Sequence, residues 1–125
     1  MQYVILAYES QDAFALRKQA VRTDEYFASW RAYTEAIRSS GIVRGGVALQ
    51  APETATTVSL AAGKRQVQDG PFADTKEQLG GYFVVEVPDL DAALTWAERC
   101  PSAEYASVEV RPLLPTSPAM DDAEA

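Results

Sequence analysis

The chain has 125 residues, of which 47% are hydrophobic and 23% are charged, and its formal net charge is −7. This length and composition indicate one globular domain and exclude a disordered or fibrous chain. The acidic balance, without any basic run, excludes the phosphate contacts on which nucleic-acid binding depends.

Cysteine and histidine are the residues that constrain metal and redox chemistry here. Cys100 is the single cysteine and histidine is absent, which excludes an intrachain disulfide and a zinc site of the usual ligands. The carboxylates show no EF-hand spacing and the glycine pairs form no phosphate-binding motif, so we expect neither a metal nor a cofactor. Cys100 precedes Pro101 near a predicted helix end, and we interpret it as a packed residue rather than a nucleophile.

The N-terminus, MQYVILAYES, has no basic leader and only a short apolar run. A cleaved signal peptide and a membrane span are therefore not expected. We predict a cytoplasmic protein.

The first half of the chain predicts one strand and one long helix. Residues 3–8 are β-branched and aromatic, which is typical of a strand covered on both faces or central in its sheet. Residues 9–22 read as a loop with at most one helical turn. From Thr23, which can cap, aromatic residues recur at helical spacing until Gly41, and we interpret Trp30 and Tyr33 as packing against a sheet rather than as a cofactor site.

The middle of the chain predicts two strands and two turns. Residues 42–49 and 54–60 are rich in β-forming residues and are separated by a break at Pro52, which predicts a hairpin between them. Asp69-Gly70-Pro71 is a turn signal. The stretch 73–79 is expected to form a short helical turn that ends at Gly80-Gly81.

The last part predicts a strand, a helix and a final strand. Residues 82–87 give the clearest strand pattern, and Asp89 is placed to cap the helix that follows and that Pro101 ends. In residues 106–113, valines alternate with Glu109 and Arg111, so one face of this strand should be buried and the other wet.

This order of elements is close to a ferredoxin-like plait, an α+β fold with helices on one face of an antiparallel sheet. We expect one domain over residues 1–113 and a mobile acidic tail over 114–125. The uncovered sheet face predicts a homodimer, and two sheets packed face to face would enclose a pocket at their seam.

Several motifs occur together in an order that resembles the DGPF-type members of the YCII-related proteins. They are DGPF at 69–72, Lys76-Glu77, Gly80-Gly81, the strand end at 86–88, the Ala-Leu-Thr-Trp-Ala helix at 93–97 and Glu-Val-Arg-Pro at 109–112. The resemblance covers nearly all of residues 1–113. It implies a dimeric α+β barrel, a cytosolic bacterial protein, a pocket near Asp69 and a functional link to a sigma factor.

The chain departs from the wider YCII group at one chemical point. A His-Asp pair has been proposed as the active site of that group, and this chain has no histidine. Histidine-assisted proton transfer therefore cannot be carried over to it.

The candidate site residues are drawn from the motif and from the first strand. Asp69 is the candidate catalytic acid or base, with the alternative that it only accepts backbone hydrogen bonds in its turn. Lys76 and Glu77 are candidate substrate-binding residues or solvated surface charges. Phe72 is a candidate binding residue that we expect to be anchored in the core, and Tyr8 is a candidate assisting group.

Three functions stay open at this point. The first is a small-molecule-binding or accessory dimer with a seam pocket near Asp69. The second is a cofactor-independent lyase or isomerase in which Asp69 moves a proton on a small oxygenated or aromatic substrate. The third is an interaction partner, for example of a sigma factor, that uses the acidic residues 121–124. The sequence does not specify the substrate, the reaction or the higher oligomeric state.

Overall fold

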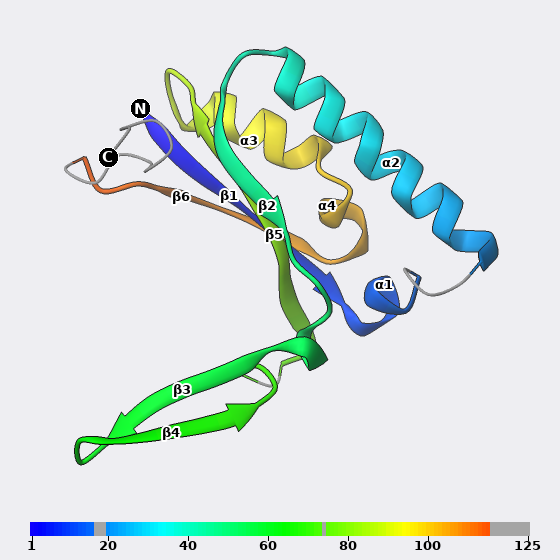
Figure 1. Ribbon diagram of the computed structural model, residues 1–125. Helices are drawn as coiled ribbons and strands as arrows, with labels where there is room; N and C mark the ends of the chain where they lie inside the picture. The colour runs from blue at the N-terminus through cyan, green and yellow to red at the C-terminus, as the bar shows by residue number, and fades with distance from the viewer. Residues whose placement is uncertain (17–19, 74, 116–125) are drawn as a thin grey trace.

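The computed structural model describes residues 1–16, 20–73 and 75–115, and for residues 20–24 the backbone only. Four strands form one antiparallel sheet in the order β2-β5-β1-β6, and two more form a separate hairpin (Figure 1). The elements are β1 (Gln2–Ser10), α1 (Gln11–Leu16), α2 (Ala20–Ser39), β2 (Val43–Ala48), the 3-10 turn η1 (Pro52–Thr54), β3 (Thr56–Ala61), β4 (Lys64–Asp69), β5 (Glu77–Glu86), α3 (Leu90–Arg99), α4 (Ser102–Tyr105) and β6 (Ser107–Pro112).

The strand order is that of a ferredoxin-like plait, with the β3–β4 hairpin inserted between its second and third strands. β1 is central, between β5 and β6, and pairs antiparallel with both. Its side chains alternate in burial along the whole strand, because successive residues of a strand point to opposite faces. The predicted α+β class is confirmed, and of the two alternatives for the first strand, covered on both faces or central in its sheet, the structure shows the central position.

The core lies between the sheet and the helices α2 and α3. Ile5 and Val85 on the sheet face Ile37 of α2, and all three are fully buried. Tyr33 of α2 makes edge-to-face contacts with Trp30, Phe83 and Trp96, a geometry that aromatic rings favour. The expectation that Tyr33 packs against the sheet is therefore confirmed.

The C-terminal end of α2 and the start of α3 agree with the sequence prediction. Gly41 follows α2 with a φ of +82°, the left-handed conformation that glycine adopts after a helix. Asp89 caps α3 by accepting a hydrogen bond from the Ala92 N–H at 2.9 Å. The start of α2 differs, because the helix begins at Ala20 and Thr23 lies within it.

The predicted hairpin between residues 42–49 and 54–60 is wrong. β2 pairs with β5, whereas β3 pairs with β4 from Thr56↔Asp69 to Ala61↔Lys64. Ala62 and Gly63 both have positive φ, as a two-residue turn that matches the twist of its strands requires. The strand β4 was missed because its residues are mostly polar.

Two further differences concern short segments. The helical turn expected over residues 73–79 is not present among its described residues, because β5 begins at Glu77 and runs through Gly80-Gly81. The loop expected over residues 9–22 contains α1 and the start of α2, and Glu9 belongs to β1. The short helix α4 after Pro101 was not predicted.

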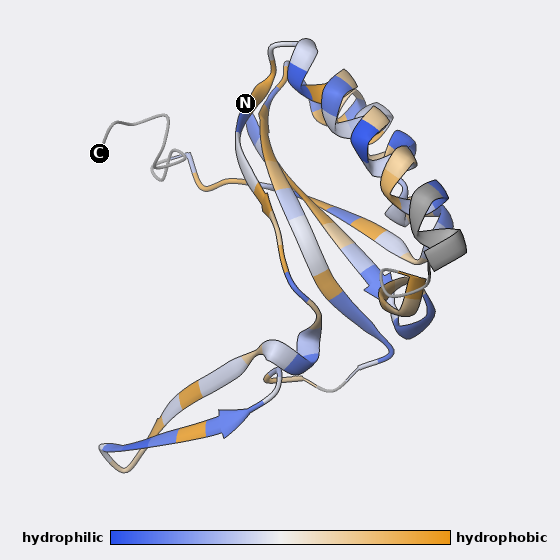
Figure 2. Ribbon diagram, turned by 45° about the vertical axis from the view of Figure 1, so that its right-hand side comes forward, coloured by the Kyte–Doolittle hydropathy of each residue, from blue (hydrophilic) through white to orange (hydrophobic). Residues whose placement is uncertain are grey.

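The sheet is covered on one face only. Figure 2 shows the helices on one side of the sheet, and in the described part of the chain no helix lies on the other. We call this second face the open face. By strand alternation and register it carries Val4, Leu6, Tyr8, Tyr82, Val84, Glu86, Glu109 and Arg111.

The predicted tail, residues 114–125, lies outside the described residues from position 116 onward. Within the residues that are described, no helix is long and apolar enough to cross a membrane.

Candidate functional site

A cavity of about 290 Å³ lies between α2 and the sheet, and we call it the α2 pocket. It opens beside β2 and β5, and its lining is mostly apolar. The helix contributes Tyr26, Phe27, Trp30, Thr34 and Arg38, and the strands contribute Ala7, Glu9, Gly46, Val47, Ala48, Gly80, Gly81, Tyr82 and Phe83.

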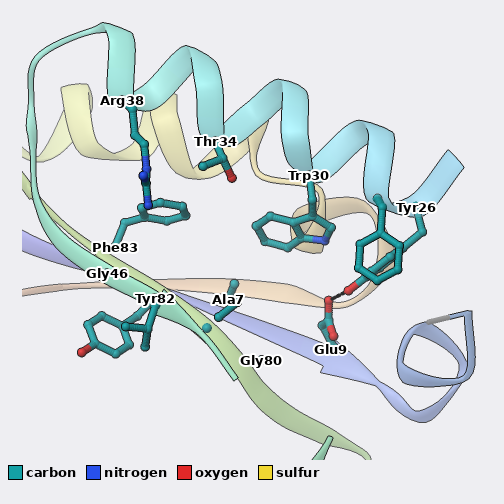
Figure 3. A pocket seen from close by; sticks show the side chains of 14 residues that line it. Ala7, Glu9, Tyr26, Trp30, Thr34, Arg38, Gly46, Gly80, Tyr82 and Phe83 are labelled. Atoms are coloured by element: carbon teal, nitrogen blue, oxygen red, sulfur yellow. Dashed lines mark hydrogen bonds between the residues drawn. The ribbon is translucent and has the colours of Figure 1, made fainter. Parts of the chain in front are cut away.

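Glu9 is the polar group at the inner end of this pocket. It is the last helix-facing residue of β1 and only 2% exposed. The hydroxyl of the equally buried Tyr26 donates a hydrogen bond to Glu9 Oε1 (Figure 3). This bond offsets part of the cost of taking a carboxylate out of water.

Gly80 makes room for the Glu9 side chain. A Cβ atom at position 80 would lie 3.1 Å from Glu9 Cδ and 3.1 Å from Glu9 Oε2, which is tighter than nine in ten real Cβ contacts. The neighbouring Gly81 lets β5 approach β2, since its Cβ would lie 2.8 Å from the Val47 carbonyl oxygen. Each glycine of the pair thus permits a close approach, Gly80 of a side chain and Gly81 of a neighbouring strand.

Trp30 contributes a second polar atom to the pocket wall. Its indole Nε1 is buried and has no hydrogen-bond partner within the described part of the chain. A buried donor without a partner costs free energy, and a ligand acceptor would satisfy it. The interpretation of Trp30 as a packing residue is therefore incomplete, because it also lines the pocket.

Arg38 lies toward the opposite end of the pocket from Glu9 (Figure 3). It is exposed in the last turn of α2, and no ion pair joins it to another described residue. The pocket thus has a hydrogen-bond acceptor at one end, an indole donor in its wall and a cation at the other end.

The four candidate site residues of the motif, Asp69, Phe72, Lys76 and Glu77, are not among the residues that line this pocket. Asp69 is exposed at the end of β4, and no described group hydrogen-bonds to its carboxylate, so the expected turn bonds are not found. Phe72 is 89% exposed, which contradicts its predicted anchoring in the core. Lys76 is exposed in the segment before β5. Glu77 begins that strand and accepts a hydrogen bond from the Ser107 hydroxyl at 2.7 Å.

Tyr8 lies on the open face rather than in the α2 pocket. Its hydroxyl donates to Glu109 at 3.3 Å, and Glu109 pairs with Arg111 on the same strand. Burial, together with the neighbouring Glu109, raises the pKa of Tyr8, and hydrogen bonding from Arg111 lowers the pKa of Glu109. Tyr8 is therefore a neutral hydroxyl at neutral pH, and Glu109 is an ionised carboxylate.

Sequence reasoning missed Glu9 as a functional candidate. The available signal was the period of two in the first strand, which places position 9 on the same face as Tyr3, Ile5 and Ala7. A carboxylate on an otherwise apolar face is unusual and points to a site.

Comparison with known proteins assigns the family. Residues 1–117 match the family model of the YCII-related domain. The chain belongs to the YCII-related family. Its assignment to the DGPF type within that family stays a prediction.

Two further comparisons extend over most of the chain. A protein of Rhizobium meliloti (strain 1021) described as uncharacterized is 36% identical over 119 residues, covering 90% of this chain and 92% of that protein. A solved structure of 5-chloro-2-hydroxyhydroquinone dehydrochlorinase from Burkholderia phenoliruptrix, in complex with 2,5-dihydroxybenzoquinone, aligns with a TM-score of 0.51 at 19% identity. That alignment covers 91% of this chain and 94% of the other. At this identity the likeness shows a shared fold alone.

Among the described residues, no group of three or more histidine, cysteine, aspartate or glutamate side chains is arranged to hold a metal ion.

Proposed function

We propose that this YCII-related protein binds a small, planar, oxygenated molecule in the α2 pocket. The observation that carries the proposal is the buried Glu9 carboxylate at the inner end of an apolar cavity, in the space that Gly80 leaves open. A fold that retains a buried carboxylate in an apolar wall departs from ordinary packing, and such departures concentrate at functional sites.

The lining specifies the ligand's polarity. A ring of hydroquinone size fits a cavity of about 290 Å³. A hydroxyl on that ring would donate to Glu9, and a carbonyl or second hydroxyl would accept from Trp30 Nε1. The bound molecule of the dehydrochlorinase structure, 2,5-dihydroxybenzoquinone, has both kinds of group and is a suitable first probe.

Tryptophan fluorescence tests this proposal directly, because Trp30 lines the pocket and Trp96 does not. In a Trp96→Phe background we expect saturable quenching by 2,5-dihydroxybenzoquinone or a related hydroquinone. Glu9→Gln should weaken binding at least about tenfold, because a hydrogen bond to a charged group is worth about 1.5–3 kcal/mol. Glu98→Gln, an exposed change on α3, is the matched control. The proposal is wrong if no such ring binds, or if Glu9→Gln and Glu98→Gln bind equally.

The same carboxylate favours a second function, a cofactor-independent lyase or isomerase. Glu9, within hydrogen-bonding distance of the Tyr26 hydroxyl, is placed to take a proton from a bound hydroxyl. The sequence assigned this role to Asp69, which stays a prediction for a seam pocket. Turnover by Glu9→Gln and Asp69→Asn separates the two: the catalytic carboxylate is the one whose loss lowers turnover by about a hundredfold or more while the fold persists.

The proposal includes a homodimer built on the open face. Val4, Leu6 and Val84 are apolar side chains on that face, and each is already half-buried by its strand neighbours. Packing against a second copy of the chain would remove this apolar surface from water. The dimeric α+β barrel, the seam pocket with Tyr8, Phe72, Lys76 and Glu77, the link to a sigma factor and the cytoplasmic location are predictions that belong to this proposal.

A further inference from the structure

The β3–β4 hairpin stands apart from the rest of the molecule. Neither of its strands makes extensive contact with another element in the described part of the chain. In Figures 1 and 2 it leaves one end of the sheet and points away from the side that α2 and α3 cover. An isolated two-stranded hairpin is at best marginally stable in water, so this one needs a surface to pack on.

The two faces of the hairpin differ in chemistry. Val58 is paired with Val67 and Leu60 with Arg65, and these side chains share one face. Val58, Leu60 and Val67 are 62%, 73% and 53% exposed. The opposite face carries Thr57, Ser59, Gln66 and Gln68, which are polar. This segregation is typical of a strand pair with one buried face.

We propose that the apolar face of the β3–β4 hairpin packs on the open face of a second copy of this chain, reciprocally in a two-fold dimer. The inference rests on the homodimer proposed above and specifies how it is held together. It also brings Asp69 and Phe72, at the base of the hairpin, to the seam between the copies.

The required contact area supports a second copy as the occupant. A hairpin of two six-residue strands offers about 200 Å² on one face, from strand rise and spacing. The open face offers about 400 Å² over the six residues that its strands share. Reciprocal packing buries about 200 Å² of hairpin and an equal patch of open face on each copy, which is twice the area of a one-sided hairpin contact. A stable interface needs about 800 Å² per partner, so reciprocal contact with a second copy comes closer to this area than a one-sided contact with another partner.

Charge favours the same occupant. Lys64 and Arg65 lie next to the hairpin turn, and neither forms an ion pair with another described residue. The chain carries −7, so the remainder without these two residues carries −9. Glu86 and Glu109 are the acidic side chains on the open face that the basic tip of the other copy would meet, and such complementarity steers association.

Site-directed crosslinking tests the arrangement. Leu60→Cys is placed in one copy and Val4→Cys, Leu6→Cys or Val84→Cys in a second copy of different length, both in a Cys100→Ala background. We expect a mixed disulfide with at least one open-face position. Ser59→Cys, next to Leu60 but on the polar face, is the control and should crosslink little.

Sedimentation equilibrium gives the second measurement. Leu60→Asp should raise the dimer dissociation constant at least tenfold, whereas Ser59→Asp should change it less than threefold. If the unsubstituted chain is a monomer at tens of micromolar, both this inference and the proposed homodimer are wrong. If the chain is a dimer but Leu60→Asp and Ser59→Asp behave alike and no open-face cysteine crosslinks to position 60, only the hairpin contact is wrong. Ligand binding in the α2 pocket is measured independently of either outcome.

Discussion

Glu9 and Gly80 depend on each other sterically, because the Glu9 carboxylate occupies the space where a larger residue at position 80 would place its side chain. A Cβ atom added at position 80 would lie 3.1 Å from Glu9. Neither β1 nor β5 can move freely, since each strand is paired on both sides. The pocket's polarity thus depends on two residues on adjacent strands, 71 positions apart in the sequence.

We expect Gly80→Ala to lower the free energy of unfolding by about 1–3 kcal/mol, the usual cost of overpacking a filled site. In a Glu9→Ala background the same change should cost less, because the contacted atoms are gone. Urea unfolding of the two single variants and the double variant gives the coupling energy. If the stability losses of the two single variants add up in the double variant, Gly80 is required for a reason other than its contact with Glu9.

Cys100 gives a pH-dependent prediction. Burial raises the pKa of its thiol from about 9 to about 11, so the folded chain holds this proton more tightly than the unfolded chain does. The neutral thiol therefore contributes stability that is complete below about pH 9 and lost as the pH rises to 11. Relative to Cys100→Ala, the unsubstituted chain should lose about 2 kcal/mol across this range, measured by urea unfolding at each pH. If the free energies of unfolding of the two proteins changed in parallel with pH, the raised pKa of Cys100 would be contradicted.

The start of the helix α3 is fixed by one capping side chain. Asp89 accepts the Ala92 N–H, and α3 then buries Ala93 and Ala97 against the sheet. The local signal and the tertiary contacts agree in this helix, which is why its boundaries could be predicted from the sequence.

Asp89→Ala should lower the free energy of unfolding by about 1 kcal/mol, the typical value of an N-cap. Asp91→Ala is the matched control, since Asp91 lies in the first turn and interacts with the helix dipole without capping it; we expect a few tenths of a kcal/mol there. Thermal unfolding of both variants distinguishes them. Equal losses of stability would mean that the hydrogen bond from the Ala92 N–H adds nothing beyond the effect of a negative charge near the helix N-terminus.

Strand partners were harder to predict than strand positions. The run at residues 54–60 was recognised, but its pairing with β4 rather than β2 depends on a turn at Ala62-Gly63 that carries a weak local signal. Residues 77–79 have no strong strand propensity, and they become part of β5 because Tyr8, Glu9 and Ser10 supply its ladder. Such pairing is a tertiary effect that overrides propensity.

The whole molecule consists of a compact body and a projecting hairpin (Figure 1). The buried core contains no residue from β3 or β4. The ends of the hairpin lie close together, since the Gly70 N–H donates to the Ala55 carbonyl at 2.7 Å. A short linker can therefore replace the hairpin without displacing β2 or β5.

We expect a chain in which two glycines replace residues 56–69 to fold cooperatively, with far-UV circular dichroism and a melting temperature within a few degrees of the parent at low concentration. It should no longer dimerise, so the parent alone should gain stability as concentration rises. Loss of cooperative unfolding would show that the hairpin belongs to the body's core.

The sequence by itself determined the α+β class, the family resemblance, the first strand, the C-terminal end of α2 and the cap of α3. Each depends on local periodicity or on a side chain that contacts the backbone of its own element. Tertiary structure decided the rest. It placed the DGPF turn on an exposed hairpin and made β5 a long strand. It also buried Glu9 beneath α2, because the position of a side chain relative to residues distant in sequence depends on strand pairing and helix packing, which no local pattern contains.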